Sequence, residues 1–329
     1  MKLATLKNGE RDGQLVVVSR DLSRCAPAGR FAPTMLYAIE NWSRVKGALI
    51  ARYDELNANG IEGARDFHPS GCAAPLPRAP QWLDGSSFLN HGMLMQQAFH
   101  LDPIPDAESI PLMYQGASDD FIGPTDDIVV PNDLDGLDFE GEVAVVIDEV
   151  PMNVSTEDAG QHIKLLMLVN DVSLRAHGPR EMVTGFGFLH AKPSTAFGPV
   201  AVTPDELGDA WQNGRVYLPL RVQYNDARVG EPDGREMNFS FGELIAHAAK
   251  TRRLHAGTIV GSGTFSNTSR TAGSACIAEV RAIETIEYGA PQTSFMRFGD
   301  RVRVEMLDAE GNSVFGAIEQ SARAPVPNV

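Results

Sequence analysis

An apolar run that opens with two carboxylates constrains the fold of this chain more than any other feature. Residues 137–147 read LDFEGEVAVVI, and Val143–Ile147 are apolar without alternation. Strands that are covered on both faces read this way. Glu140 and Glu142 point to the same face of such a strand, because side chains alternate with a period of two. Burying both carboxylates costs much free energy unless a positive group compensates it.

A simpler interpretation of the Glu-x-Glu pattern is a solvent-facing strand edge, but the unbroken apolar residues Val143–Ile147 argue against it. Residues 163–171 form a second apolar strand candidate that also ends in a carboxylate, Asp171. Alone, an Asp at a strand end is usually a turn former or a helix cap. Together with Glu140 and Glu142, however, Asp171 completes an all-oxygen set that suits Mg²⁺, Ca²⁺ or Mn²⁺ and suits zinc poorly. We therefore predict a bound hard divalent cation.

Asp84 and His91 lie in a third informative segment, DGSSFLNH. If Asp84 begins a helix, His91 lies two turns further, rotated by about 20° and displaced by roughly 10 Å along the axis. That geometry suits one metal ligand and one acid/base group with a substrate between them. The alternative is an N-cap Asp followed by an ordinary helix histidine.

The rest of the chain predicts few helices and many short strands. Helices are expected from Pro33 to the Asn57–Gly60 break, over roughly Gly85–His100, and after a capping box at Ser240–Glu243. Short runs rich in β-branched residues predict strands at Leu15–Ser19, Asp127–Val130, Val143–Ile147, Lys164–Val169, Val216–Tyr224, Thr258–Val260, Ile277–Glu287, Val302–Met306 and Ser313–Ile318.

These elements predict an α+β, β-rich fold with a mixed-sheet core. Strands and helices do not alternate regularly, which disfavours a doubly wound or barrel architecture of the α/β type. The proline-rich stretch His68–Pro80 predicts a linker. We therefore expect an N-terminal domain over residues 1–78 and a catalytic domain over residues 79–329.

Composition narrows the partners of the chain. The formal charge is −15, from 28 basic and 43 acidic residues, which disfavours nucleic acid and anionic membranes as partners. The sequence shows neither a signal peptide nor a membrane-spanning stretch, and its three cysteines are widely spaced, so we expect a cytoplasmic protein without a disulfide scaffold. The Gly-x-Ser-x-Gly elbow of α/β serine hydrolases and complete phosphate-binding loops are absent.

Six pieces of the sequence, taken in order, resemble the fumarylacetoacetate hydrolase family. The resemblance covers roughly residues 80–325 and rests on Asp84-x₆-His91, Pro111-Leu-Met-Tyr-Gln-Gly116, Asp138-Phe-Glu-Gly-Glu142, Asn170-Asp-Val-Ser-Leu-Arg175, Lys192-x₄-Phe-Gly198 and Gly261-Ser-Gly-Thr264. It implies a mixed β-roll or β-sandwich catalytic domain with a small N-terminal domain. It also implies bound Mg²⁺ or Ca²⁺, with Mn²⁺ as a further option, and a homodimer.

The resemblance also assigns roles to individual residues. The metal carboxylates of the family fall on Asp84, Glu140, Glu142 and Asp171. His91 matches the histidine that activates water. Arg175 and Lys192 match basic groups that hold the substrate and stabilise negative charge, while Tyr114 and Thr264 match substrate contacts.

Three positions depart from the family pattern. Ser86 stands where longer hydrolases of the family have an aromatic residue, and Gly178 stands where they have a glutamine. Their late catalytic glutamate matches Glu279 only with an offset of two residues. We assign Glu279, or a chain of water molecules, to protonation of the leaving carbon.

The expected activity is metal-dependent hydrolysis of a carbon–carbon bond in a small 1,3-diketo acid, with 4-fumarylacetoacetate giving fumarate and acetoacetate. Related sites hydrate, isomerise or decarboxylate 2-oxo acids or hydrolyse acylpyruvates, and the pairing of Asp84 with His91 favours hydrolysis. A protein that binds a small acid through a cation without turnover is the alternative from another class.

Overall fold

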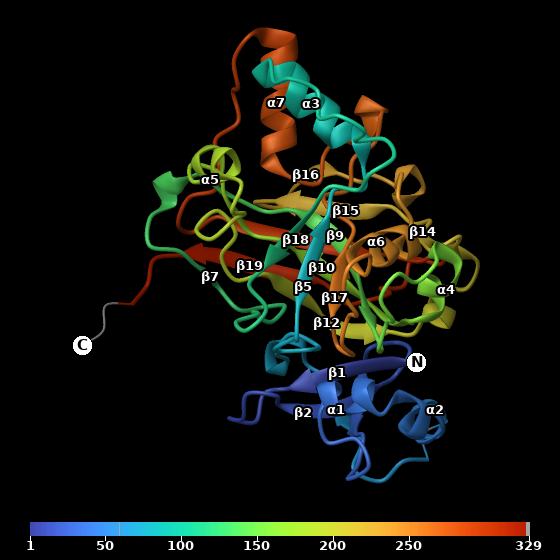
Figure 1. Ribbon diagram of the computed structural model, residues 1–329. Coiled ribbons are helices and arrows are strands. Elements are labelled where there is room, and N and C mark those ends of the chain that lie inside the picture. Colours follow the sequence, from blue (N-terminus) through green and yellow to red (C-terminus); the bar gives the residue numbers. More distant parts are fainter. Residues whose placement is uncertain (59, 327–329) are drawn as a thin grey trace.

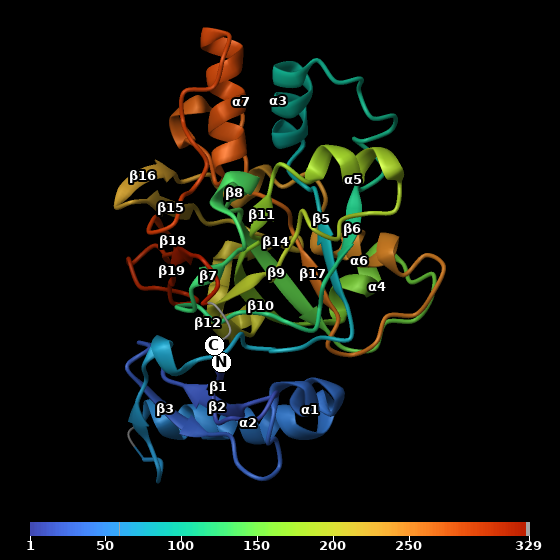
Figure 2. The same ribbon diagram turned by 90° about the vertical axis from the view of Figure 1, so that its left-hand side faces the viewer.

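A long mixed sheet forms the centre of the molecule. The computed structural model describes residues 1–58 and 60–326. In this part of the chain a ten-stranded sheet has the order β4-β3-β2-β1-β12-β10-β9-β17-β5-β6, and a five-stranded sheet has the order β16-β15-β18-β19-β7. Both sheets are visible in Figures 1 and 2. The prediction of a β-rich mixed fold with an N-terminal domain is confirmed.

The bounds of the elements are as follows. The strands of the long sheet are β1 (Lys2–Leu6), β2 (Gln14–Val18), β3 (Arg24–Pro27), β4 (Arg65–Asp66), β5 (Trp82–Gly85), β6 (Met113–Gly116), β9 (Gly141–Ile147), β10 (Ile163–Asn170), β12 (Ala196–Val202) and β17 (Ile259–Gly261). The second sheet contains β7 (Ile128–Val129), β15 (Leu220–Tyr224), β16 (Ala227–Gly230), β18 (Arg301–Met306) and β19 (Ile318–Arg323). Two short pairs join β8 (Leu137–Asp138) to β11 (Ser173–Leu174) and β13 (Trp211–Gln212) to β14 (Arg215–Val216). The helices are α1 (Met35–Glu40), α2 (Trp42–Asn57), α3 (Leu89–Phe99), α4 (Thr156–Gln161), α5 (Gly178–Thr184), α6 (Phe241–Ala248) and α7 (Ile277–Tyr288).

Strand β9 shows why the apolar run of the sequence does not alternate. All seven residues of β9 are buried. Val143 and Val145 belong to one hydrophobic core, whereas Ala144 and Val146 belong to a second core on the other face of the sheet. Because each face of the strand meets apolar side chains, every position is apolar. Glu142 is therefore a fully buried carboxylate on the same face as Ala144 and Val146.

The N-terminal residues extend the same sheet. β1 pairs with β12 in antiparallel register, with Lys2 opposite Val202, and β2 to β4 follow outward. Helix α2 covers this part with buried residues at helical spacing, including Trp42, Val45 and Leu49. In Figure 2 these elements lie together at one end of the molecule, away from α3 and α7.

Two predicted helices are corrected by the structure. The helix expected from Pro33 is two helices that meet at Asn41, whose backbone N–H still bonds to Tyr37 and whose φ of −117° breaks the helical geometry. It ends at Asn57, and Asn59 in the predicted break lies outside the described residues. The helix expected over Gly85–His100 begins only at Leu89, because Asp84 and Gly85 belong to β5, which pairs with β6 and β17.

Two predicted strands are wrong. Ile277–Glu287 is the helix α7, since Cys276 caps its first turn and its apolar positions face α3, where Ala282 joins Leu94 and Ala98 in a small core. Ser313–Ile318 is irregular until β19 begins at Ile318, because Gly316 has a φ of +72°, in the left-handed region outside strand geometry. In both cases tertiary packing and backbone geometry override the β-branched composition.

Several strands of the structure were not predicted at all. The strands β3, β5, β6 and β12 were not predicted, because they contain Gly or Pro, and β1 was also missed.

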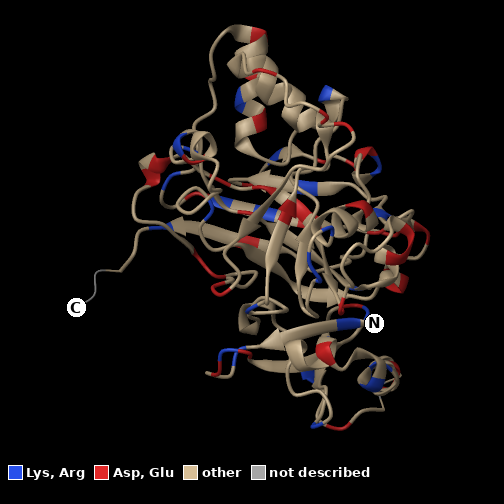
Figure 3. Cartoon of the chain, in the orientation of Figure 1, with Lys and Arg blue, Asp and Glu red and all other residues tan. Residues whose placement is uncertain are grey.

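Acidic and basic residues are spread over all parts of the chain rather than segregated by domain (Figure 3). Within the described residues, no helix combines the length and the apolar character that crossing a bilayer requires.

Candidate active site

Three buried carboxylates from different strands meet in the interior. Asp84 lies on β5, Glu142 lies on β9 and Asp171 directly follows β10. Each offers an oxygen within 4.8 Å of the others. Their exposed fractions are 4%, 0% and 0%. The sheet order places β17 between β5 and β9 and β10 beside β9, so the three residues come from one continuous set of strands.

The electrostatics of this carboxylate group fit a cation. Neither oxygen of Glu142 has a hydrogen-bond donor among the described residues. Burial, followed by repulsion from Asp84 and Asp171, raises the pKa of Glu142 well above its ordinary value. Burial and Asp171 raise the pKa of Asp84 in the same way. An all-oxygen group in which Glu142 has no donor fits a hard divalent cation, because the cation would offset both the desolvation and the repulsion.

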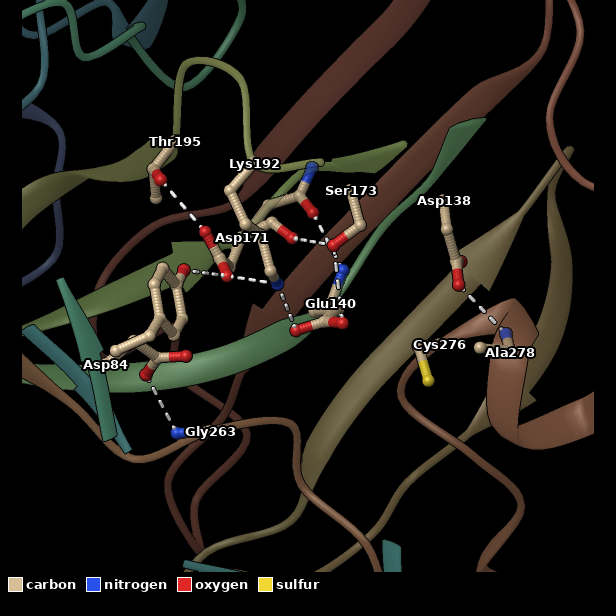
Figure 4. Close-up of polar contacts among 12 residues, drawn as sticks. Asp84, Asp138, Glu140, Asp171, Ser173, Lys192, Thr195, Gly263, Cys276 and Ala278 are labelled. Carbon is tan, nitrogen blue, oxygen red and sulfur yellow. Dashed lines mark hydrogen bonds and ion pairs between the residues drawn. The ribbon is translucent and has the colours of Figure 1, made fainter. Parts of the chain in front are cut away.

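Glu140 lies outside this group of three and is paired with two cationic side chains of the protein, Lys192 and Arg175. Lys192 Nζ donates to one of its oxygens at 3.0 Å (Figure 4). A terminal nitrogen of Arg175 lies 2.5 Å from its other oxygen. Burial would raise the pKa of Glu140, but Lys192, Arg175 and His91 outweigh it and hold that pKa below its usual range. The structure thus brings together three of the four predicted metal carboxylates, and the metal-binding role of Glu140 stays a prediction.

Asp171 accepts hydrogen bonds from three neighbouring side chains. Tyr114 donates its hydroxyl to one carboxylate oxygen at 2.6 Å, and Lys192 donates to the same oxygen at 2.5 Å. Thr195 donates to the other oxygen at 2.9 Å. The sequence interpretation missed Thr195, although it lies three residues after Lys192 within the same matching piece. Burial would lower the pKa of Lys192, but Asp171 and Glu140 raise it, so this side chain is a fixed positive charge.

His91 forms a pair with Glu279. His91 is on α3 and Glu279 is on α7, and Nδ1 of the imidazole lies 2.9 Å from the carboxylate. Glu279 is 1% exposed. When Nδ1–H donates to a carboxylate, Nε2 keeps the lone pair and can accept a proton. The expected one-helix relation of Asp84 and His91 is wrong, since the two residues lie on a strand and on the following helix.

Asp138 fixes the start of α7 and was not predicted as a functional residue. One of its oxygens accepts from the backbone N–H of Ile277 at 2.8 Å. The other accepts from the backbone N–H of Ala278 at 2.9 Å (Figure 4). Arg175 Nε also donates to Asp138 at 2.9 Å. Burial raises the pKa of Asp138, while Arg175 opposes the rise. A buried carboxylate at a helix N-terminus satisfies free N–H groups, so Asp138 links Arg175 to the helix that carries Glu279.

The Gly261–Thr264 segment approaches Asp84 through its backbone. The N–H of Gly263 donates to Asp84 at 3.1 Å. Gly263 has a φ of +77°, and a Cβ there would lie 2.2 Å from the carbonyl oxygen of Gly85. Only glycine fits such a close approach. Thr264, the predicted substrate contact, is buried directly after it.

The chain that follows helix α5 contacts the site through Phe188. The ring of Phe188 makes an edge contact with Tyr114 at 5.2 Å between centroids. Glu181 accepts three backbone N–H groups, from Leu189, His190 and Ala191, which ties the helix to the chain that follows it. Gly178, one of the departures from the family pattern, is the first residue of α5.

Comparisons with known proteins agree with this architecture. The family model of the fumarylacetoacetate (FAA) hydrolase C-terminal domain matches residues 81–322, and that of the fumarylacetoacetase N-terminal domain 2 matches residues 1–78. The chain is similar to a 2,4-didehydro-3-deoxy-L-rhamnonate hydrolase of Sphingomonas sp., with 31% identity over 165 residues that cover 49% of this chain and 54% of the relative. It is also similar to a mitochondrial oxaloacetate tautomerase of Xenopus laevis, with 29% identity over 49% of each chain. The match thus spans about half the length of these relatives.

Solved structures share the fold over the whole chain. A maleylpyruvate hydrolase from Sphingobium sp. SYK-6, in complex with manganese(II) and pyruvate, superposes with a TM-score of 0.65 at 18% identity. The superposition covers 99% of this chain and 100% of that chain. At this level of identity, the likeness concerns the fold.

Proposed function

The chain belongs to the fumarylacetoacetate hydrolase family, and from this premise we propose that it hydrolyses a carbon–carbon bond in a small 1,3-diketo acid. The observation that supports hydrolysis best is the hydrogen bond between His91 Nδ1 and the buried Glu279, because an imidazole that donates through Nδ1 presents Nε2 as the base. A pure binding site has no need of such a pair.

Asp84, Glu142 and Asp171 are the residues that would hold the divalent cation. Mg²⁺ or Ca²⁺ are our first candidates and Mn²⁺ is the next, since the related maleylpyruvate hydrolase was crystallised with manganese. When bound, such a cation supplies Lewis acidity and a template for the two oxygens of a 1,3-dicarbonyl.

The residues of the chain supply the proton transfers and the fixed positive charge. In the proposed reaction His91 Nε2 takes one proton from water as the oxygen attacks the distal carbonyl. Glu279 stabilises the imidazolium that results. Cleavage leaves the electron pair on the departing carbon, and Lys192 and Arg175 stabilise negative charge on that product. The proton held by His91 then passes to the departing carbon, so the products are a carboxylic acid and a shorter oxo acid.

This mechanism changes the role expected for Glu279. The sequence interpretation assigned Glu279 to protonation of the leaving carbon, whereas its oxygen lies 2.9 Å from His91. We infer that Glu279 instead orients the imidazole of His91 and stabilises the positive charge that forms on it. The substrates to compare are 4-fumarylacetoacetate and the acylpyruvates, since one relative is named for a didehydro-deoxy sugar acid and a structural neighbour for maleylpyruvate.

A chelator-controlled assay tests the proposal. Turnover of 4-fumarylacetoacetate and of an acylpyruvate should disappear in EDTA and return with Mg²⁺ or Mn²⁺. Oxaloacetate is the third substrate, because the tautomerase relative favours proton transfer without bond cleavage as the second candidate function. Metal-dependent tautomerisation of oxaloacetate without any carbon–carbon cleavage would replace the hydrolase proposal with that second function.

A further inference from the structure

A groove of about 470 Å³ runs along one flank of α3, beside the candidate active site. The helix and the chain just before it form one wall, and the segment between α3 and β6 forms the other. The lining residues are Ser86, Leu89, Gly92, Met93, Gln96, Pro103, Ile104, Asp106, Ala107, Glu108, Ser109 and Leu112. The proposed mechanism uses none of these residues.

The floor of the groove continues the strand pair that carries Asp84 and Tyr114. In the β5–β6 ladder Asp84 lies opposite Tyr114. Two residues further along each strand, the N–H of Ser86 donates to the carbonyl oxygen of Leu112 at 2.9 Å. Alternation places Ser86 and Leu112 on the same face as Asp84 and Tyr114. Two residues of strand span about 7 Å, so the groove begins about that far from a carboxylate of the proposed metal site.

Helix α3 separates the groove from the proton-transfer pair. At about 100° per residue, Leu89, Met93 and Gln96 share one flank of the helix, and His91 lies on the opposite flank, toward Glu279 on α7. A diketo acid held at Asp84 can therefore meet His91 on one side of the helix start and extend its acyl tail along the other.

The chemistry of the lining selects the kind of tail. Met93, Ile104 and Leu112 are 53%, 47% and 38% exposed, so apolar side chains face solvent in the groove. The charged residues of the lining are Asp106 and Glu108, and no Lys, Arg or His is among the lining residues that the structure describes. A carboxylate in this groove would lose water, meet acidic neighbours and find no cation. An uncharged tail would instead cover the exposed apolar side chains.

We propose that this groove is the subsite for the acyl tail and that the protein selects 1,3-diketo acids whose tail is uncharged over those whose tail ends in a carboxylate. This inference rests on the proposed hydrolase function and narrows it toward acylpyruvates with neutral tails. It ranks 4-fumarylacetoacetate, whose acyl tail carries a carboxylate, below such substrates.

A matched pair of substrates tests the charge preference. 2,4-Dioxooctanoate and 2,4-dioxooctanedioate have the same length and differ only in a terminal carboxylate. In Mg²⁺ we expect kcat/KM to be about tenfold higher for the neutral compound, which is the size of selectivity that one repelled, unpaired charge provides. Equal values, or a preference for the dioate, would overturn the proposal.

Groove variants locate the preference. Met93→Trp should fill the groove and lower kcat/KM for 2,4-dioxooctanoate about tenfold, while 2,4-dioxopentanoate, which has only a methyl tail, changes less than about twofold. Met152→Trp is the matched control, because Met152 is 61% exposed and is not part of the groove lining. Glu108→Lys should raise kcat/KM for the dioate several-fold, with Glu62→Lys on the N-terminal domain as its control. Equal losses on the long and short substrates in Met93→Trp would contradict the subsite.

Binding measurements separate the groove from the hydrolase function. Calorimetry in Mg²⁺ with 2-oxohexanoate and 2-oxoadipate compares neutral and carboxylate tails without any bond cleavage. Tighter binding of 2-oxohexanoate that is lost in Met93→Trp supports the groove even if no diketo acid is hydrolysed, in which case only the hydrolase proposal fails. Cleavage of diketo acids without any tail preference in binding would remove the groove and leave the hydrolase function in place.

Discussion

The candidate active site joins two regions that are built differently. The carboxylates Asp84, Glu142 and Asp171 belong to strands flanked by the two large hydrophobic cores. His91 and Glu279 belong to α3 and α7, which project from the body of the molecule (Figures 1 and 2) and share a small core centred on Leu94, Ala98 and Ala282. The groups that would hold a cation thus lie between large cores, whereas the groups that would transfer protons stand on a helix pair with a small core of its own.

The two regions also differ in how well their charges are satisfied. Glu142 has no donor among the described residues and a raised pKa, so the carboxylate group is destabilising without a cation. His91 and Glu279 satisfy each other directly. The strands thus store unfavourable electrostatic energy that a cation would relieve, while the helices carry a pair that is already complete.

Glu142→Gln should abolish measurable turnover and yet stabilise the metal-free protein. The amide removes a negative charge from a group whose members repel one another, so the Tm measured in EDTA should rise by a few degrees. The same change weakens the proposed cation site, so the Tm gain from Mg²⁺ should disappear. Glu62→Gln, on the exposed surface, is the control and should alter neither quantity. A lower Tm in EDTA would show that Glu142 is not electrostatically strained.

His91→Ala should lower kcat by about a thousandfold and leave cation binding intact, because general base catalysis contributes on this scale. Glu279→Gln should cost less, about tenfold to a hundredfold, since the imidazole remains but loses its charged partner. Steady-state kinetics and calorimetric titration with Mn²⁺ measure the two properties separately. Loss of cation binding in His91→Ala would mean that the two regions do not work independently.

Asp138→Asn tests how the helix region is attached to the strands. The amide keeps the size of the side chain but cannot accept from Ile277, Ala278 and Arg175 as the carboxylate does. We expect a loss of about 1–3 kcal/mol in the free energy of unfolding and about a tenfold loss in kcat. Asp226→Asn is the control, since Asp226 is an exposed partner of Arg301 and such surface pairs contribute little.

A double variant shows whether Asp138 acts through the helix. If Asp138 supports catalysis by holding Glu279, kcat of Asp138→Asn/Glu279→Gln should equal that of Glu279→Gln alone. Multiplicative losses would show that Asp138 acts on the reaction by a separate route, through Arg175.

The smallest expected effect is a pH dependence of the stabilisation by metal. The folded-state pKa values of Asp84 and Glu142 are raised above their ordinary values of 3.8 and 4.5. Their contribution to stability is therefore fully present below those ordinary values and is lost as the pH rises through the raised ones. The Tm of the metal-free protein should fall relative to that of the Mg²⁺-loaded protein as pH increases above about 5. Scanning calorimetry at several pH values measures this gap, and a gap independent of pH would contradict the account.

The strand region was more predictable from the sequence than the helix region, for physical reasons. The unbroken apolar residues of β9 and β10 indicate burial on both faces, so the carboxylates beside them had to lie inside. By contrast, Ile277–Tyr288 has a β-branched composition, and its helical form depends on Asp138, which lies far away in sequence, and on packing against α3. Local composition does not report such contacts.

Individual site residues also differ in how well the sequence predicted them. Asp84 and His91 were identified, but their relation was misplaced, because the residues between them leave a strand before the helix begins. The pairing of His91 with Glu279 joins positions 188 residues apart, and no spacing rule predicts it. The position of Glu140 outside the carboxylate group follows from Lys192 and Arg175, whose side-chain directions a sequence does not give.

Anomalous diffraction from a crystal grown with Mn²⁺ can locate the cation itself. We expect one strong anomalous peak bounded by carboxylate oxygens of Asp84, Glu142 and Asp171, with His91 outside the coordination sphere. No peak between these three side chains in crystals grown with excess Mn²⁺, or a peak elsewhere, would contradict it.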